Sequence, residues 1–303
     1  MNLAEKLSKV DMTTDNRISP EDRKYCEAHQ KAYTTALRDL KDLISYWEGV
    51  RDEQDTILGD FDNDVLKYSN YISIEDFSIR NVEKKLLNIH ELFVRFIIGY
   101  FNKTYNILLE LNGIKDAIIP QKPEYDYIDR VNYDKKLDAW EKEMMELTVN
   151  YQDIIDRILI QLDGRTFLER AVDEIIESCH DGGWSGKEPN FEIKGDTIRF
   201  KDYFCDYSDW YSSNNWRMNA KMKCIIPGLY HFETGLIGDM PYSFSRMLSS
   251  FSYPELDMDS GGKLKLIKCF KNGRVDVKFS SKTVADEFAD RYLGFVSGGG
   301  VAV

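Results

Sequence analysis

Apolar side chains recur every three or four residues along three long stretches of the first 180 residues, which is the spacing of one face of an α-helix. The first stretch begins at Ser19-Pro20-Glu21-Asp22, where a serine N-cap, a proline at the first helical position and two acids in the first turn are typical of a helix start. Its apolar face consists of Tyr33, Leu37, Leu40, Ile44, Trp47 and Val50. We expect this long helix to end at Gly59.

Two further stretches predict long helices. The second runs from about Asn81 to Asn112-Gly113 and is apolar on nearly all sides at residues 92–101, which is typical of a helix covered by its neighbours. A tyrosine-rich connector follows at residues 117–130. The third stretch, residues 137–162, is expected to end at Gly164, and a shorter helix follows at about residues 165–179. Together they predict an antiparallel helical bundle or an extended helical arm.

The pattern changes after Asp181-Gly182-Gly183. Residues 191–200 alternate around Lys194-Gly195-Asp196 and predict a hairpin. A second hairpin is predicted over residues 264–279, because Asn272-Gly273 favours a two-residue type I′ turn.

That turn would pair Phe270 with Val275 and Leu266 with Phe279. The buried face would then carry Leu264, Leu266, Phe270, Val275, Val277 and Phe279, and the solvent face Lys265, Arg274, Asp276 and Lys278. A last helix is expected between a Ser281 cap and Gly294. The predicted fold class is therefore α+β, with a long-helix domain at residues 1–181, a small α+β domain with antiparallel hairpins at residues 182–296 and a loose tail at residues 297–303.

Charge and cysteine usage narrow the class of protein. The net charge is −12, and the acids are concentrated in residues 1–200, which carry −13 against +1 for residues 201–303. A uniformly basic nucleic-acid-binding protein is therefore not expected. The cysteines are odd in number and never spaced as CxxC, which favours reduced thiols over a zinc site or a disulfide framework. We find no signal peptide or membrane-spanning stretch, and we expect a cytoplasmic protein.

No pattern in the chain predicts a catalytic centre, a cofactor or a metal ion. Residues 60–64 alternate carboxylates as a calcium loop does, but Val65 stands where the turn glycine is needed and Tyr71 where a glutamate is needed. Cys179-His180-Asp181 joins a thiol, an imidazole and a carboxylate, yet adjacent residues rarely face one another as a nucleophile and its base must. His231, expected in an irregular segment, has no partner at metal-ligand spacing. We therefore expect a protein that is not an enzyme.

Two clusters are candidates for contact with a partner or with nucleic acid. The first is aromatic: it runs from Tyr203 to Trp216 and is followed by Arg217, Lys221 and Lys223. Aromatic rings beside cations can stack single-stranded bases, but they can also fill the core of a small domain. We favour the core interpretation. The second is the charged face of the second hairpin, which could contact phosphates or could keep the sheet solvated. The candidate contact residues are Tyr207, Trp210, Tyr211, Trp216, Arg217, Lys265, Arg274 and Lys278.

The C-terminal third resembles a domain family of unknown function that occurs in phages, plasmids and other mobile elements, either alone or attached to adenine-type DNA methyltransferases. The resemblance lies in Tyr46-Trp47-Glu48, the hairpin at residues 191–200, the hairpin segment at residues 267–279 and the helix at residues 284–292. It implies a phage or mobile-element origin. No catalytic residue carries over, because this chain has no methyltransferase half.

Three hypotheses follow for the function. The first is a non-enzymatic, oligomeric phage or mobile-element protein that binds and inhibits a host protein complex, such as an anti-phage defence system, in the host cytoplasm. The second is a nucleic-acid-associated accessory module that works beside a DNA methyltransferase or a replication protein. The third is an enzyme whose active-site residues are scattered along the sequence.

Overall fold

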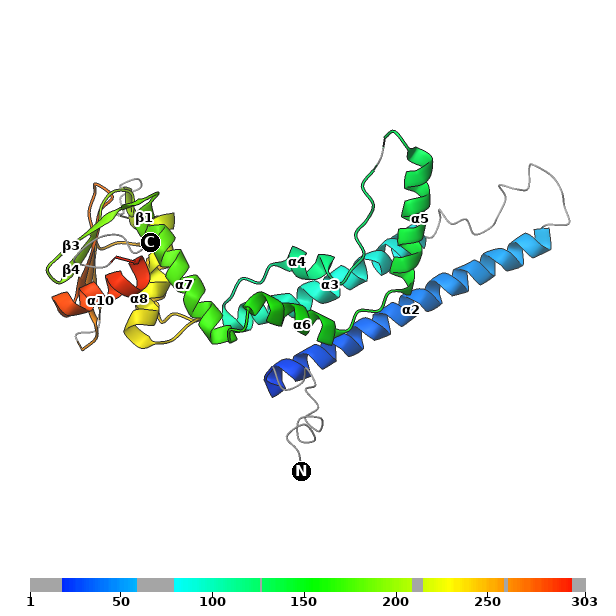
Figure 1. Ribbon diagram of the computed structural model, residues 1–303, viewed down its shortest axis with the longest axis horizontal. Coiled ribbons are helices and arrows are strands. Elements are labelled where there is room, and N and C mark those ends of the chain that lie inside the picture. The colour runs from blue at the N-terminus through cyan, green and yellow to red at the C-terminus, as the bar shows by residue number, and fades with distance from the viewer. Residues whose placement is uncertain (1–17, 59–78, 126, 209–214, 259–260, 296–303) are drawn as a thin grey trace, which may run out of the picture. The chain divides into compact units, whose positions relative to one another are not determined.

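The computed structural model describes residues 18–58, 79–125, 127–208, 215–258 and 261–295, and contacts within the chain divide it into two compact units (Figure 1). Unit 1 comprises Met1–Thr104 and Leu109–Gly164, and unit 2 comprises Tyr105–Leu108 and Arg165–Val303. The described part of unit 1 is helical, whereas unit 2 combines helices with antiparallel sheets. The predicted α+β class is confirmed. The acidic segment at residues 60–64 and the predicted tail at residues 297–303 lie outside the described residues.

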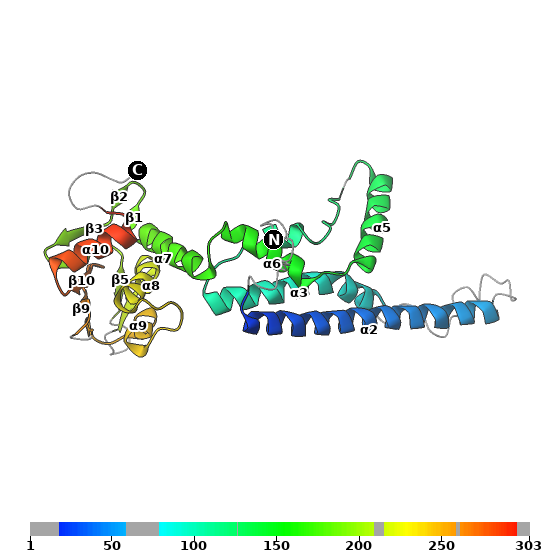
Figure 2. The ribbon, with the colours of Figure 1, turned by 60° about the horizontal axis from the view of Figure 1, so that its bottom comes forward.

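Unit 1 is built on two long helices, α2 (Pro20–Leu58) and α3 (Ile79–Tyr105), which lie side by side in opposite directions (Figures 1 and 2). The start of α2 is as predicted: the backbone N–H of Ser19 donates to Asp22 at 3.0 Å, and the N–H of Asp22 donates to the Ser19 hydroxyl at 3.1 Å. This reciprocal pairing satisfies two backbone donors that the first helical turn leaves open.

The remaining helices of unit 1 differ from the predicted ones. The second helix ends at Tyr105, because Asn106 takes the left-handed conformation (φ 53°), and Asn112-Gly113 lies inside a short separate helix, α4 (Leu111–Asp116). The third stretch forms two helices instead of one, α5 (Arg130–Glu146) and α6 (Tyr151–Leu162). Leu147 turns into extended backbone (ψ 138°), and the Asn150 side chain caps α6 by accepting from the N–H of Gln152. In both views α5 rises away from the α2–α3 pair (Figures 1 and 2).

Unit 2 contains a five-stranded antiparallel sheet in the order β3-β4-β10-β9-β8. Its strands are β3 (Phe191–Lys194), β4 (Thr197–Phe200), β8 (Glu255–Asp257), β9 (Leu264–Cys269) and β10 (Val275–Phe279). A smaller sheet contains β5 (Cys205–Ser208), β6 (Asn215–Met218) and β7 (Ser250–Phe251), and β1 (Trp184–Ser185) pairs with β2 (Glu188–Pro189). The helices are α7 (Phe167–Gly183), α8 (Ala220–Thr234), the short α9 (Tyr242–Ser245) with the 3₁₀ turn Arg246–Leu248, and α10 (Lys282–Leu293). One hydrophobic core joins the sheet to α7, α8 and α10.

Helix α7 lies in unit 2, whereas the sequence pattern places residues 165–181 in the long-helix domain. The reason is its packing against α8, which is so close that a Cβ on Gly228 would lie 2.2 Å from Sγ of Cys179. The sequence did not predict α8, which contains Pro227. The expectation that His231 lies in an irregular segment is wrong, since this residue is buried in the last turn of α8.

The first hairpin forms as predicted, and its turn has two residues, with Lys194 opposite Thr197. The register predicted for the second hairpin is wrong: Val275 pairs with Cys269, and Phe279 pairs with Leu264. The turn is one residue longer, because the N–H of Gly273 donates to the carbonyl of Phe270.

The longer turn changes which residues are buried. Cys269 and Ile267 enter the core, whereas Phe270 and Leu266 are only half-buried. The last helix is as predicted: the Ser281 hydroxyl accepts from the N–H of Val284, and Gly294 ends the helix at φ 62°.

Candidate binding surfaces

The solvent face of the five-stranded sheet carries charges of alternating sign. The strand register places five side chains in one row across the sheet: Glu192, Arg199, Asp276, Lys268 and Glu255. Directly paired residues in an antiparallel sheet point to the same face, so each charge lies beside its opposite. The ion pair between Arg199 Nε and Asp276 Oδ2 measures 3.6 Å, and Lys268 pairs with Glu255. We call this row the charge ladder.

Two of the three cations predicted to contact a partner on this face are paired with carboxylates. Arg274 Nε lies 3.1 Å from Asp276 Oδ1, and Lys278 Nζ lies 3.8 Å from Asp196 Oδ2. The Asp276 carboxylate is only 15% exposed, and burial raises its pKa above the ordinary value although the neighbouring arginines oppose the shift. Lys265 lies at an irregularity of the register, between two paired residues of β9. The face therefore has little unbalanced positive charge with which to attract phosphates.

The aromatic cluster divides into core and surface residues. Phe204 and Trp216 are buried, as the core interpretation predicts, and Tyr207 is half-buried with its ring 4.8 Å from that of Trp216. Arg217 is exposed on β6. Trp210 and Tyr211 lie outside the described residues.

The most unusual residue of this cluster was not among the predicted contact residues. Tyr203 is 78% exposed and takes the left-handed conformation at φ 64°, which is rare for a bulky side chain. Its backbone lies against the turn of the second hairpin, where the N–H groups of Phe204 and Cys205 both donate to the carbonyl of Gly273. No sequence signal marks Tyr203, because its conformation depends on a turn some seventy residues away in the chain.

A second exposed aromatic surface lies in unit 1, at the N-terminal end of α5. Tyr127 is 88% exposed and Ile128 97% exposed, and the ring of Tyr125 lies 4.7 Å from Tyr127 and 4.8 Å from Tyr133. Residues 123–134 also contain four acids against one arginine. We call these residues the tyrosine tip. The sequence shows its tyrosines as part of a connector, but it does not show that they are exposed.

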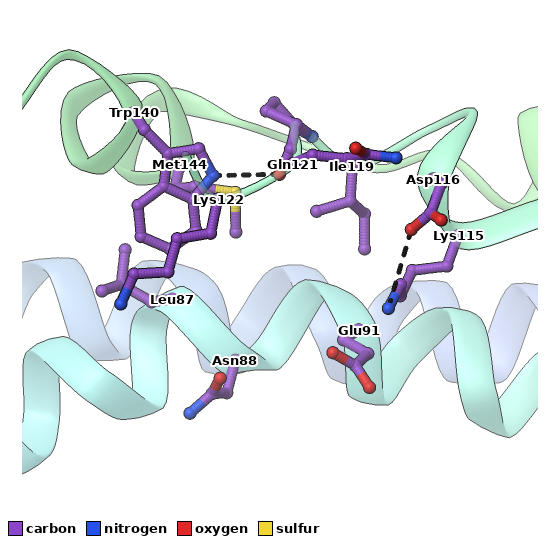
Figure 3. A pocket seen from close by; sticks show the side chains of 11 residues that line it. Leu87, Asn88, Glu91, Lys115, Asp116, Ile119, Gln121, Lys122, Trp140 and Met144 are labelled. Atoms are coloured by element: carbon purple, nitrogen blue, oxygen red, sulfur yellow. Dashed lines mark hydrogen bonds and ion pairs between the residues drawn. The ribbon is translucent and has the colours of Figure 1, made fainter. Parts of the chain in front are cut away.

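Unit 1 also contains a pocket of about 370 Å³ between α3, α5 and the segment after α4 (Figure 3). The indole N–H of Trp140 donates to the carbonyl of Pro120 at 2.9 Å at one end, and Lys115 pairs with Asp116 at the other. The other lining residues are Leu87, Asn88, Glu91, Ile119, Gln121, Lys122 and Met144. Two lysines balance two acids, so the pocket suits a group that combines apolar parts with hydrogen-bonding atoms.

The base of α5 is held by a buried hydrogen-bond network. His90 Nε2 lies 2.9 Å from the carbonyl of Met144 and must donate to it, since a carbonyl only accepts. His90 Nδ1 therefore accepts from the Tyr33 hydroxyl at 2.8 Å, and that hydroxyl accepts in turn from the N–H of Val149 at 3.0 Å. Burial lowers the pKa of His90 and keeps it neutral. The network joins α2, α3 and the connection between α5 and α6.

The Cys179-His180-Asp181 triplet does not form a nucleophile with its base. The Cys179 thiol is buried between α7 and α8, where it donates weakly to the carbonyl of Cys224, and burial raises its pKa to about 12. His180 is exposed and lies 3.9 Å from its neighbour Asp181. Within the described part of the chain, no three His, Cys, Asp or Glu residues converge as metal ligands would.

Comparison of the chain with models of known families, with curated proteins and with solved structures finds no match. The resemblance to the phage and plasmid domain family therefore stays a prediction. Among the described helices, none combines the length and the apolar composition needed to cross a lipid bilayer.

Proposed function

We propose that this chain is a non-enzymatic protein of a phage or mobile element that binds and inhibits a host protein complex, such as an anti-phage defence system. The origin rests on the resemblance of the C-terminal third. The binding role rests on one observation, the exposed tyrosine tip at the end of α5. Tyrosine is enriched among the residues that dominate protein interfaces, because it buries a large area at a low cost in side-chain entropy.

The charge of unit 1 supports the same role and indicates the kind of partner. Residues 111–163 contain twelve acids and seven bases, a net charge of −5, and the tip itself has a net charge of −3. An acidic aromatic surface is complementary to a protein surface that presents arginine or lysine around an apolar recess. We therefore expect the partner to contribute a basic surface.

The test compares variants of the tagged full-length protein in affinity purification from a nuclease-treated bacterial lysate. The tip variant is Tyr127→Ser with Ile128→Ser. The control variant is Tyr242→Ser with Tyr253→Ser, which removes two side chains of unit 2 that are 79% and 77% exposed. Truncating an interface hot spot costs about 2 kcal/mol or more, so the tip variant should bind its partner at least about 30-fold more weakly.

Retention of one host complex by the wild type and the control, but not by the tip variant, is the expected outcome. Equal retention of the host complex by both variants would show that the tyrosine tip does not make the contact. A wild-type protein that retains no host protein would contradict the proposed function.

Self-association is part of this proposal. Leu43, Tyr46 and Ile57 are exposed along the second half of α2, and such apolar side chains on a long helix favour pairing with another helix. Light scattering after size exclusion should give a mass above the 35.3 kDa of one chain. A monomer at micromolar concentration would contradict this part of the proposal alone.

A further inference from the structure

The turn between β9 and β10 in unit 2 is surrounded by aromatic rings and cations. Lys271 Nζ lies 4.3 Å from the centre of the Tyr207 ring, and the Arg274 guanidinium lies 3.7 Å from the centre of the Phe270 ring. Tyr203 lies against the same turn through the hydrogen bonds that its neighbours make to Gly273. We call these side chains, together with Lys201, the turn patch.

The charges of the turn patch differ from those of the charge ladder. Phe200 and Val275 are the last paired residues of β4 and β10, and the next residue on each side is a cation, Lys201 beside Arg274. Arg274 is paired with Asp276, but no ion pair among the described residues involves Lys201 or Lys271. Lys271 therefore lies over an aromatic ring and not beside a carboxylate, whereas Lys201 is close enough to Glu192, at the end of the charge ladder, to lower the pKa of that carboxyl.

Tyr203 combines an exposed ring with a strained backbone. A left-handed conformation costs a non-glycine residue roughly 1–3 kcal/mol, and it persists only where the surroundings impose it. Here the two hydrogen bonds to the Gly273 carbonyl fix the residues that follow Tyr203. A glycine at this position would adopt the conformation without strain, so tyrosine is not the residue that stability alone would select.

We propose that the turn patch is a binding site for single-stranded nucleic acid. The exposed Tyr203 ring stacks an unpaired base, and Lys201 and Lys271 contact the phosphates on either side. Paired bases are already stacked on one another and offer no free face, so duplex is not the ligand. With only two unpaired lysines, the affinity is modest and depends on salt with a small slope. This site lies in a different unit from the tyrosine tip and does not rest on the proposed function.

The test measures the fluorescence anisotropy of labelled twelve-residue oligothymidylate and oligouridylate with the full-length protein, in 50 to 200 mM salt. Tyr203→Gly should weaken binding about tenfold, because base stacking on one aromatic ring is worth about 1–3 kcal/mol. The thermal midpoint of this variant should not fall, since the substitution relieves backbone strain. A loss of binding could then not be attributed to unfolding.

Two charge variants separate the turn patch from the rest of the sheet. Lys271→Glu should weaken binding several-fold and reduce the salt dependence by about one phosphate contact. Lys278→Glu, on the same sheet but paired with Asp196, should have a much smaller effect. Unequal binding of the two oligonucleotides would identify DNA or RNA as the natural ligand.

Three outcomes would overturn the proposal: no binding by the wild type at 50 mM salt, equal binding by wild type and Tyr203→Gly, or tighter binding of a duplex of the same length. None of them bears on the tyrosine tip. Both measurements, the affinity purification and the oligonucleotide titration, are made on the same protein preparations.

Discussion

Replacing Tyr33 with phenylalanine removes one hydroxyl from the interior of unit 1 and leaves the ring in place. The ring stacks on Phe93 at 4.5 Å between centres, and the substitution preserves this contact. What it removes is the hydroxyl that donates to His90 Nδ1 and accepts from the N–H of Val149. Both partners are buried, and the substitution leaves each of them without the hydroxyl.

The expected magnitude follows from the two groups left behind. A buried donor or acceptor that loses its partner costs about 1–3 kcal/mol. Two such groups are left behind, so Tyr33→Phe should destabilise unit 1 by about 2–6 kcal/mol. A matched control is Tyr46→Phe on the same helix, where the side chain is 65% exposed and the expected change is below about 0.5 kcal/mol.

Hydrogen exchange measured in increasing urea is the suitable assay, because the two units need not unfold together and peptides from each can be followed separately. Peptides covering residues 86–101 report on unit 1, and peptides covering residues 264–279 report on unit 2. The free energy of opening should fall in the first set and stay unchanged in the second. A Tyr33→Phe protein within 0.5 kcal/mol of the control would refute the argument that this hydroxyl satisfies two buried groups.

Three further predictions concern stability and reactivity. Burial lowers the pKa of His90 and of His231, so as the pH falls the unfolded chain takes up protons on these residues before the folded chain does. The free energy of unfolding should therefore fall as the pH drops below about 6.5. Urea unfolding midpoints at pH 8 and pH 5.5 measure this change. Gly273→Ala should destabilise unit 2 by about 1–3 kcal/mol, because φ is +85° and the added Cβ would lie 2.9 Å from the Tyr203 nitrogen. Gly195→Ala is the control: its added Cβ would have no atom within 4 Å, so it should cost less in the same urea titration. Cys224, which alone among the cysteines is not buried, should be the one that iodoacetamide labels in the native protein, as peptide mass spectrometry would show.

The sequence predicted best where a structure depends on neighbouring residues. The start of α2 at Ser19 and the cap of α10 at Ser281 each need only a side chain and a backbone N–H three residues later, and both are as predicted. The hairpin at residues 191–200 is equally local. The break between α5 and α6 is different. Its residues continue an apolar helical stripe, and the helix stops there because Val149 and Met144 bind Tyr33 and His90 from other helices.

The second hairpin shows how one distant contact can override a local preference. Asn272-Gly273 favours a two-residue turn, and the chain makes a longer one. The carbonyl of Gly273 accepts from both Phe204 and Cys205, so the turn is also the attachment point of the segment that contains Tyr203. A register shift of one residue exchanges the two faces of a strand, which explains why Phe270 and Leu266 were assigned to the wrong face.

The candidate sites were harder to predict than the fold, because function depends on which charges remain without a partner. Lys271 and Lys278 both lie in the second hairpin, one in its turn and the other in β10. Lys278 lies beside Asp196, while Lys271 lies over Tyr207. The residue that lies beside each lysine depends on the strand register and on the length of the turn. The sequence alone determines neither. A lysine that already binds a carboxylate gains little from a phosphate, since it must give up one partner for the other. We therefore expect nucleic-acid contact to depend on Lys201 and Lys271 and not on the paired cations of the charge ladder.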